Sequence, residues 1–581
     1  MPQPMPMPPR ALRPSLRRPG APLRLLGLAL PWLLAQAVQA QVPPAPPALP
    51  TLAEPGRAPL RPVLPTPGLG SAPISVPQAA AAQAPAGAEA LRFTLRRLQI
   101  DGASRYDDAS LQPLYAGLLA QEISVAQVFG VAQALELRYR NAGFVTTRVV
   151  VPQQTVEDGV FRIRVVEGRL SDIVFDADIG PARAAVERLL EPLRGQVPVS
   201  IHEIDRRLLL ANDLGGLTVR ATLEPAPNTL GGSVLQVRVL RQPREATLSL
   251  DSRSSPYLGW ASLGGTVSFN ALGARADRIS LAARSSLETG RSANASAAWD
   301  ALLSDDGLSL NAALSLAASR PRRELQALDV QSQVRSAQLG LTWPLIRSRQ
   351  QNLRAVGQLE LRDVDTDIAG QAFTRDRLRV LRLGLSYERA DELDGISAAR
   401  LVLHQGLRMA GARRSGDALA SRRNGRPDFT KLTLDLTRVQ QLGARSSLML
   451  AATGQWSSGA LLASEEMALG GASFGRGYDD GEIAADQGVA VSAEIRHHPQ
   501  WAGLPLAPQL YAFVDAGQLR ATAQGAPLAN GRSLASAGAG VRADLMPGAI
   551  ATLELAKPLN ATPRTQDNRH PRLFLRWVQQ F

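Results

Sequence analysis

Hydrophobic and polar residues alternate one by one through most of residues 246–581. Between residues 308 and 316, leucine and alanine at even positions alternate with serine, asparagine and alanine at odd positions. The pattern returns at residues 353–362, 381–387, 432–436, 448–456, 489–495 and 553–555. Alternation with a period of two predicts β-strands. Strands with charged residues on one face and leucine, alanine or glycine on the other are typical of a transmembrane barrel with a wet lumen and a lipid-facing exterior.

Two features favour a membrane barrel over a globular β-sandwich, whose strands also alternate. Several tryptophans stand at the ends of expected strands, as in the aromatic girdles of membrane barrels. The six tryptophans of this region are Trp260, Trp299, Trp343, Trp456, Trp501 and Trp577. Residues 573–581 form an alternating segment that ends on Phe581, and a last strand that pairs with the first removes both unpaired edges. We therefore predict an antiparallel transmembrane β-barrel over residues 246–581, with Trp577 and Phe581 as its C-terminal signature.

The number of strands follows loosely from the length of this region. Division of its 336 residues among 16 strands gives 21 residues for each strand with its connection. About 10 residues suffice for one tilted membrane-spanning strand, so the remainder is expected in turns and loops. Sixteen strands are expected, although 14 or 18 fit the same arithmetic.

A different periodicity precedes the barrel. Residues 124–141 carry Val128, Val131, Leu135 and Tyr139 at helical spacing, and residues 200–212 repeat this pattern. Helices are also expected at 108–119 and 181–193, and alternating segments surround each pair of helices. Residues 92–168 and 169–245 contain 77 residues each, so the pattern predicts one β-α-α-β-β unit twice. We assign residues 91–168 and 169–245 as two domains, and tandem units of this kind are typical of binding arrays.

The first 90 residues predict export followed by a linker. Residues 1–40 contain five arginines and no acid, a short apolar run at 25–34, and small residues before Ala40. This is the pattern of a secretory signal peptide with cleavage after Ala40. Residues 41–90 hold 13 prolines and few charged or aromatic residues. They are expected to form an extended linker, with a short helix within residues 77–90.

Composition narrows the function further. The net charge is +13, from 64 basic and 51 acidic residues, but only Lys431 and Lys557 are lysine and the arginines are scattered. A nucleic-acid groove would concentrate basic and aromatic residues on one face, so no nucleic-acid partner is expected. The absence of cysteine excludes disulfides, thiolate metal sites and thiol catalysis. A mean hydropathy of −0.07 excludes a bundle of transmembrane helices but not a barrel.

The segment at about 457–488 carries the candidate mechanism. It contains Gly475, Arg476, Gly477 and Tyr478, followed by three acids. Glycines on both sides of an arginine let the backbone turn and approach a wall closely, and the guanidinium group can bind a carboxylate. The alternation of residues 510–515 places Phe513 and Asp515 in the lumen, and an ionisable residue there is expected to be paired or functional. We expect Arg476 to fold inward onto Asp515. In the alternative, Arg476 stays in solvent and Asp515 lines a wet pore.

No enzyme, metal or cofactor is expected. Residues 471–475 match G-x-S-x-G, but the expected strand-to-helix elbow of a hydrolase is missing there. The five histidines, at positions 202, 404, 497, 498 and 570, show no metal-ligand spacing.

Together these residues resemble the outer-membrane transporters of two-partner secretion, which export haemolysins and filamentous haemagglutinins. The resemblance covers nearly everything after residue 91, including residues 139–144, 151–154 and 166–168. That family has two periplasmic POTRA domains and a 16-stranded barrel. Its sixth extracellular loop carries a [V/I]-R-G-[F/Y] tetrad that folds inward onto an F-x-D-x-G motif. Here the tetrad reads Gly475, Arg476, Gly477 and Tyr478, with glycine at its first position, and the strand motif has Phe513, Asp515 and Gly517.

The resemblance implies export of an unfolded partner exoprotein through the barrel without ATP. The POTRA domains would bind that partner in the periplasm of a Gram-negative bacterium, and the barrel would sit among outer-membrane lipids. Periplasmic chaperones and the barrel-assembly machinery would act during its biogenesis. An assembly or insertion factor for other outer-membrane proteins is the alternative within the same superfamily, and two POTRA units rather than more argue against it.

Overall fold

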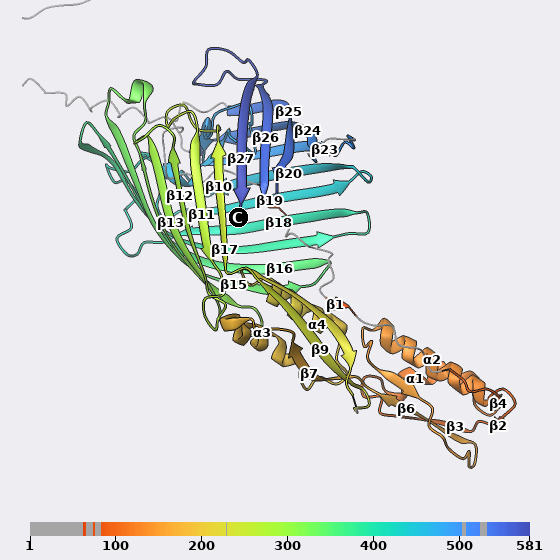
Figure 1. Ribbon diagram of the computed structural model, residues 1–581. Helices are drawn as coiled ribbons and strands as arrows, with labels where there is room; N and C mark the ends of the chain where they lie inside the picture. Colours follow the sequence, from red (N-terminus) through yellow and green to blue (C-terminus); the bar gives the residue numbers. More distant parts are fainter. Residues whose placement is uncertain (1–61, 65–73, 76–82, 228, 502–506, 523–531) are drawn as a thin grey trace, which may run out of the picture. The chain divides into compact units, whose positions relative to one another are not determined.

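The computed structural model describes residues 62–64, 74–75, 83–227, 229–501, 507–522 and 532–581 (Figure 1). The expected signal peptide lies outside these residues, as does most of the expected linker. Within the linker, β1 (Ile74–Ser75) is a strand that pairs in parallel with β8 of the second repeat, and Ile74 is buried there. Of the helix expected within residues 77–90, residues 77–82 lie outside the described residues, and residues 86–90 form turns, with Gly87 at φ +87°.

The elements of the first repeat follow the expected β-α-α-β-β order, except that the first strand is divided into β2 and β3 and a further strand, β4, lies between the helices. The elements are β2 (Arg92–Thr94), β3 (Arg97–Asp101), α1 (Asp108–Leu111), β4 (Glu122–Ser124), α2 (Val125–Asn141), β5 (Arg148–Val150) and β6 (Val160–Val166). Helix α2 begins at a capping box of Ser124 and Gln127 and buries the four residues expected from its periodicity. Helix α1 is shorter than expected because Pro113 cannot continue the helical bonding, and two 3₁₀ turns replace the rest of it.

The second repeat copies this topology. It contains β7 (Arg169–Phe175), α3 (Arg183–Leu190), α4 (Ile201–Asn212), β8 (Leu217–Pro225) and β9 (Gly232–Arg241). Strand β3 of the first repeat and β7 of the second lie parallel to the last strand of their repeat, and the strand before the last is antiparallel to it. Strand β2 pairs only with β4. Among the described helices, none combines the length and the apolar composition that a membrane crossing requires.

Strands β10–β20 and β23–β27 form a closed antiparallel barrel of 16 strands, as expected. In order they are β10 (Arg244–Asp251), β11 (Ser262–Phe269), β12 (Arg278–Ser286), β13 (Ser292–Leu302), β14 (Ser309–Ser319), β15 (Val330–Arg347), β16 (Gln351–Ile368), β17 (Gln371–Ala390), β18 (Gly395–Gly406), β19 (Thr430–Gln441), β20 (Ser446–Ser457), β23 (Gln487–His497), β24 (Gln509–Arg520), β25 (Arg532–Met546), β26 (Ala549–Pro558) and β27 (Arg572–Gln580). Strand β27 pairs with β10 and closes the barrel. Trp577 lies opposite Leu250 in this seam, and the backbone of Phe581 exchanges hydrogen bonds with Ala246.

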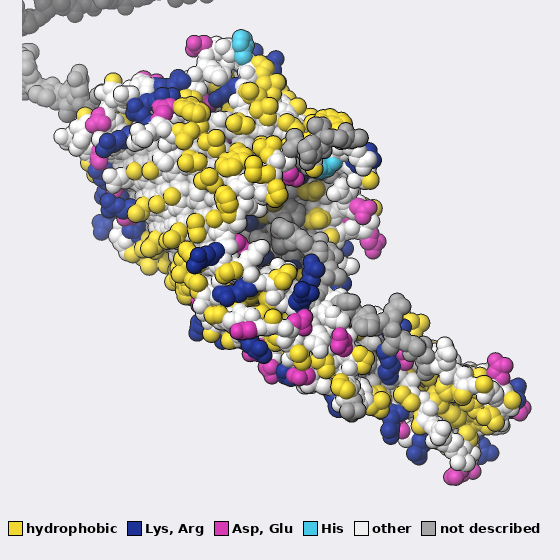
Figure 2. All heavy atoms as spheres, in the orientation of Figure 1, with side chains coloured by type: hydrophobic (Ala, Val, Ile, Leu, Met, Phe, Trp, Pro, Cys, Tyr) yellow, Lys and Arg dark blue, Asp and Glu magenta, His cyan; other side chains and the backbone are white. Residues whose placement is uncertain are grey.

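The two faces of the barrel wall follow the alternation of the sequence. Val514 is 51% exposed on the outer surface, whereas its neighbours Phe513 and Asp515 are buried inside. Hydrophobic side chains cover much of the wall on the face shown in Figure 2. Strands β15 to β17 have 18 to 20 residues, well beyond the expected spanning length. Cross-strand pairs such as Asp365 with Arg377, 2.7 Å apart, stabilise the charged part of this extension.

Candidate functional site

The segment between β20 and β23, residues 458–486, turns back into the barrel lumen; we call it the inward loop. It contains a 3₁₀ turn (Ala463–Glu465) and a small hairpin of β21 (Met467–Leu469) and β22 (Ile483–Ala485). Phe474 and Tyr478 are only 2% and 1% exposed. The loop's apolar side chains pack against wall residues such as Leu519 and Leu534. Burial of these side chains explains why the loop stays inside.

Two glycines allow the loop to turn and to touch the wall. Gly475 has φ +80°, a conformation that glycine adopts without strain. Gly477 lies against β26, where a Cβ atom would be 2.7 Å from the nitrogen of Pro558 and 2.8 Å from the carbonyl carbon of Lys557. Only glycine fits such a close backbone approach. The glycines around Arg476 therefore set the position of its side chain.

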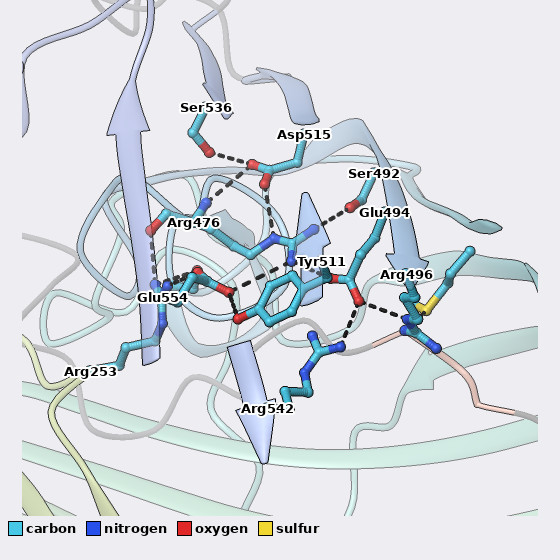
Figure 3. Close-up of polar contacts among 12 residues, drawn as sticks. Arg253, Arg476, Ser492, Glu494, Arg496, Tyr511, Asp515, Ser536, Arg542 and Glu554 are labelled. Carbon is cyan, nitrogen blue, oxygen red and sulfur yellow. Dashed lines mark hydrogen bonds and ion pairs between the residues drawn. The ribbon is translucent and has the colours of Figure 1, made fainter. Parts of the chain in front are cut away.

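Arg476 reaches Asp515 inside the barrel (Figure 3). Its Nε donates to Asp515 Oδ2 at 3.1 Å, and its backbone N–H donates to Oδ1 at 3.1 Å. Asp515 Oδ1 also accepts from the backbone N–H of Gly475 and from Ser536 Oγ, each at 2.6 Å. The side chain of Arg476 is 6% exposed and that of Asp515 is fully buried. A buried charge pair with several hydrogen bonds is costly to break from either side.

Arg476 has further partners on the wall, two of which, Ser492 and Glu494, the sequence did not single out. Its Nη1 lies 2.6 Å from Glu494 Oε2, and its Nη2 donates to Ser492 Oγ at 2.9 Å. Its guanidinium carbon lies 3.5 Å from the centre of the Phe513 ring, a cation–π arrangement. Ser492 and Glu494 stand opposite Asp515 and Phe513 in the β23–β24 register. Lumen-facing alternation on β23 could have found them, but only once the register was known.

A second layer of charges supports this cluster. Arg253 donates to the backbone oxygen of Arg476 at 2.8 Å and pairs with Glu554. Tyr511 donates to the same Glu554 at 2.8 Å. Arg542 lies 2.9 Å from Glu494. The cluster therefore ties the tip of the inward loop to several strands at once, and each buried acid has a basic partner.

The other motif residues lie beside this cluster. Tyr478 donates to Asn560 Oδ1 at 2.9 Å and to the backbone oxygen of Ala535 at 3.2 Å. Gly517 makes room for Leu469 of the inward loop, since a Cβ atom would lie 2.5 Å from Leu469 Cδ1. Trp577 and Phe581 belong instead to the closing seam of the barrel.

Glu482 gives the inward loop a predicted dependence on pH. Its Oε1 accepts from the backbone N–H of Arg564 at 2.8 Å, and its Oε2 is buried without a partner among the described residues. Burial, with a smaller contribution from Asp479, raises the pKa of Glu482 to about 7, while Arg564 and Arg572 oppose the rise. Between pH 4.5, the ordinary pKa of a glutamate, and pH 7, Glu482 therefore keeps its proton while the loop is held and loses it when the loop is released.

Proton linkage fixes the sign of this effect. The loop should be held more tightly as the pH falls from 8 to 5, by about tenfold or more in its held-to-released ratio, because each unit of pKa shift corresponds to tenfold. A spin label on a cysteine introduced at Ser473 would report this as a falling mobile fraction. Glu482→Gln should remove most of the pH dependence. An equal pH dependence in both proteins would contradict the assignment.

Comparison with known proteins places these features in context. Residues 231–543 match the profile of the haemolysin secretion/activation protein family ShlB/FhaC/HecB, and residues 93–168 match the ShlB-type POTRA domain. The outer membrane transporter CdiB of Escherichia coli is 25% identical over 444 residues, which cover 73% of this chain and 72% of that protein. The heme/hemopexin transporter protein HuxB of Haemophilus influenzae strain 86-028NP is 22% identical over 488 residues, covering 81% and 84%.

Solved structures show the same fold. CdiB from Escherichia coli matches with a TM-score of 0.72 and 21% identity, over 86% of this chain and 92% of that one. BamA from Haemophilus ducreyi lacking POTRA domains 1–3 matches with a TM-score of 0.51 and 13% identity, over 84% of this chain and all of that one.

Proposed function

Because this chain belongs to the ShlB/FhaC/HecB family of haemolysin secretion/activation proteins, we propose that it captures an unfolded partner exoprotein and passes it through its barrel to the cell surface. The chain is an outer-membrane transporter of two-partner secretion, with a POTRA domain and a 16-stranded barrel. In the proposal, both repeats stand in the periplasm, and the partner is of the haemolysin or haemagglutinin kind. Outer-membrane lipids surround the barrel, which periplasmic chaperones and the barrel-assembly machinery deliver and insert.

Capture is proposed to occur at the sheets of the repeats. In the first repeat, β3 and β5 are the edges of the sheet β3-β6-β5. An extended polypeptide can add to such an edge through its backbone hydrogen bonds, whatever its sequence. This mode suits an unfolded substrate because it requires no folded surface on the partner.

Passage is proposed to need release of the inward loop. The observation that carries this step is the buried contact of Arg476 with Asp515, which fastens the loop to the wall inside the lumen. In this proposal each round of export moves the loop between a fastened and a released state, which makes it a two-state gate. A variant whose loop cannot be fastened again therefore also loses export. Folding of the partner outside the cell would supply the driving force, so no nucleotide is required.

Reconstitution tests this proposal directly. The purified chain is inserted into lipid vesicles and given, without any nucleotide, the unfolded form of a large exoprotein whose gene is found beside its own. We expect the exoprotein to become protected from added protease in vesicles that hold this chain and to stay sensitive in empty vesicles. Sensitivity in both would contradict export. Insertion of an unrelated outer-membrane protein by the same vesicles would instead support the assembly-factor alternative.

A further inference from the structure

The inward loop is fastened to the wall at a second place, near its start and 11 residues before Arg476. Glu465 ends the 3₁₀ turn at the start of the loop, and its side chain is only 3% exposed. Lys431 of β19 donates to Glu465 Oε2 at 2.7 Å and to its backbone oxygen at 3.0 Å. Arg382 of β17 donates to Glu465 Oε1 at 3.1 Å. Both carboxylate oxygens thus bind cations of the wall.

The wall behind this contact is built to hold it. Arg382 also pairs with Glu360 of β16, which is 1% exposed and pairs with Arg362 at 2.7 Å. Gln455 of β20 donates to the backbone oxygens of Glu465 and Asp486, at 3.2 and 2.9 Å. It therefore holds both ends of the loop. Lys431 is one of only two lysines among 64 basic residues; its compact ammonium group has three donors, and two of them bind Glu465.

Apolar side chains of the loop also pack against the wall close to the Glu465 contact. Leu461 and Leu462 are buried against Leu378, Val380 and Phe429. Beyond Glu465 the contact is polar, because the loop borders a cavity of about 570 Å³ lined by residues that include Arg354, Arg400 and His404. The wall strands of this contact are β16, β17, β19 and β20, whereas Arg476 binds side chains of β23 and β24. The two contacts share no wall strand.

We propose that Glu465, acting through Lys431 and Arg382, is a second anchor of the inward loop that holds the start of the loop independently of Arg476. Glu465 is a positioning residue. Any effect of its release on export rests on the proposed function. The existence of the anchor does not rest on that function, since it can be measured in the absence of any partner. Release of the loop then requires the Glu465 cluster to break as well as the Arg476 cluster.

Cysteine reporters test the anchor because the chain has no cysteine of its own. One reporter replaces Ala463, which is 5% exposed beside Glu465, and the other replaces Ser473 near Arg476. The purified protein in phospholipid vesicles is reacted with a water-soluble maleimide. Glu465→Gln should raise the reaction rate at position 463 by about tenfold or more, since it strips the charge from a buried pair, and should change the rate at 473 by less than about twofold. Arg476→Ala should show the reverse pattern.

Matched variants complete the test. Asp435→Asn removes an acid from the same strand as Lys431, where it binds Thr453 of the wall at 2.7 Å, and should leave both rates unchanged. Lys431→Met combined with Glu465→Gln should react no faster than the more reactive single variant, because the two residues act as one unit. If Glu465→Gln fails to insert, Gln455→Met removes the backbone contacts without stranding a charge, and it should raise the rate at 463. An unchanged rate at 463, or an equal rise at both reporters, would overturn the second anchor.

Discussion

Replacement of Arg476 by alanine should lower export of the partner at least about tenfold while the barrel still inserts. Breaking a buried ion pair from one side costs about 3–5 kcal/mol, and about 1.4 kcal/mol changes an equilibrium tenfold. The wall keeps most of its own bonds in this variant. Asp515 retains its bond from Ser536, and Glu494 retains two other arginines. The substitution therefore weakens the attachment of the loop rather than the stability of the barrel.

Export and insertion must be measured in the same cells. The partner in the medium is divided by the amount of folded barrel, which migrates differently before and after heating on a gel. Arg438→Ala is the matched control, because Arg438 binds Asp391 and Ser397 within the wall, away from the loop and from the Arg476 cluster. Secretion at the wild-type level by Arg476→Ala would refute the anchoring role. Asp515→Asn should resemble Arg476→Ala, and the double variant should be no worse than either, since both remove one contact.

Local patterns predicted the parts of this protein whose structure depends on near neighbours in the chain. Helix α2 follows from the helical spacing of four apolar residues within its 17 residues. The inward direction of Asp515 follows from strict alternation along one strand. The pairing of Arg476 with Asp515 could also be predicted, because an arginine between two glycines and a lumen-facing acid stand only 39 positions apart.

Contacts that depend on closure of the barrel could not be predicted from local sequence patterns. Arg253 and Glu554 are 301 positions apart and meet only because β27 pairs with β10. Glu465 and Lys431 look like ordinary charged residues in the sequence, since alternation gives the face of a strand but not the loop that will lie on it. Strand β1 was hidden for another reason. Two residues in a proline-rich segment carry no periodicity, and only the exposed edge of β8 makes them a strand.

Substitution of Gly477 by alanine should release the tip of the inward loop although it removes no bond. An added Cβ would stand 2.7 and 2.8 Å from backbone atoms of β26, and backbone cannot give way as a flexible side chain does. Overpacking of this kind costs about 1–3 kcal/mol. The loop can relieve it only by lifting from the wall, which pulls the adjacent Arg476 away from Asp515. Export should fall by about tenfold, and the mobile fraction of a spin label at position 473 should rise.

Gly459 supplies the control within the same loop. A Cβ atom there would meet only the side chain of Arg426, at an ordinary 3.7 Å, so Gly459→Ala should leave export and label mobility unchanged. Gly477→Val should be worse than Gly477→Ala, because a larger side chain requires a larger displacement from the same wall. If Gly477→Ala exports normally with an immobile label, then the close approach of the loop to β26 is not what holds Arg476 in place. In that case the ion cluster alone fixes the tip, and the glycine serves only the turn.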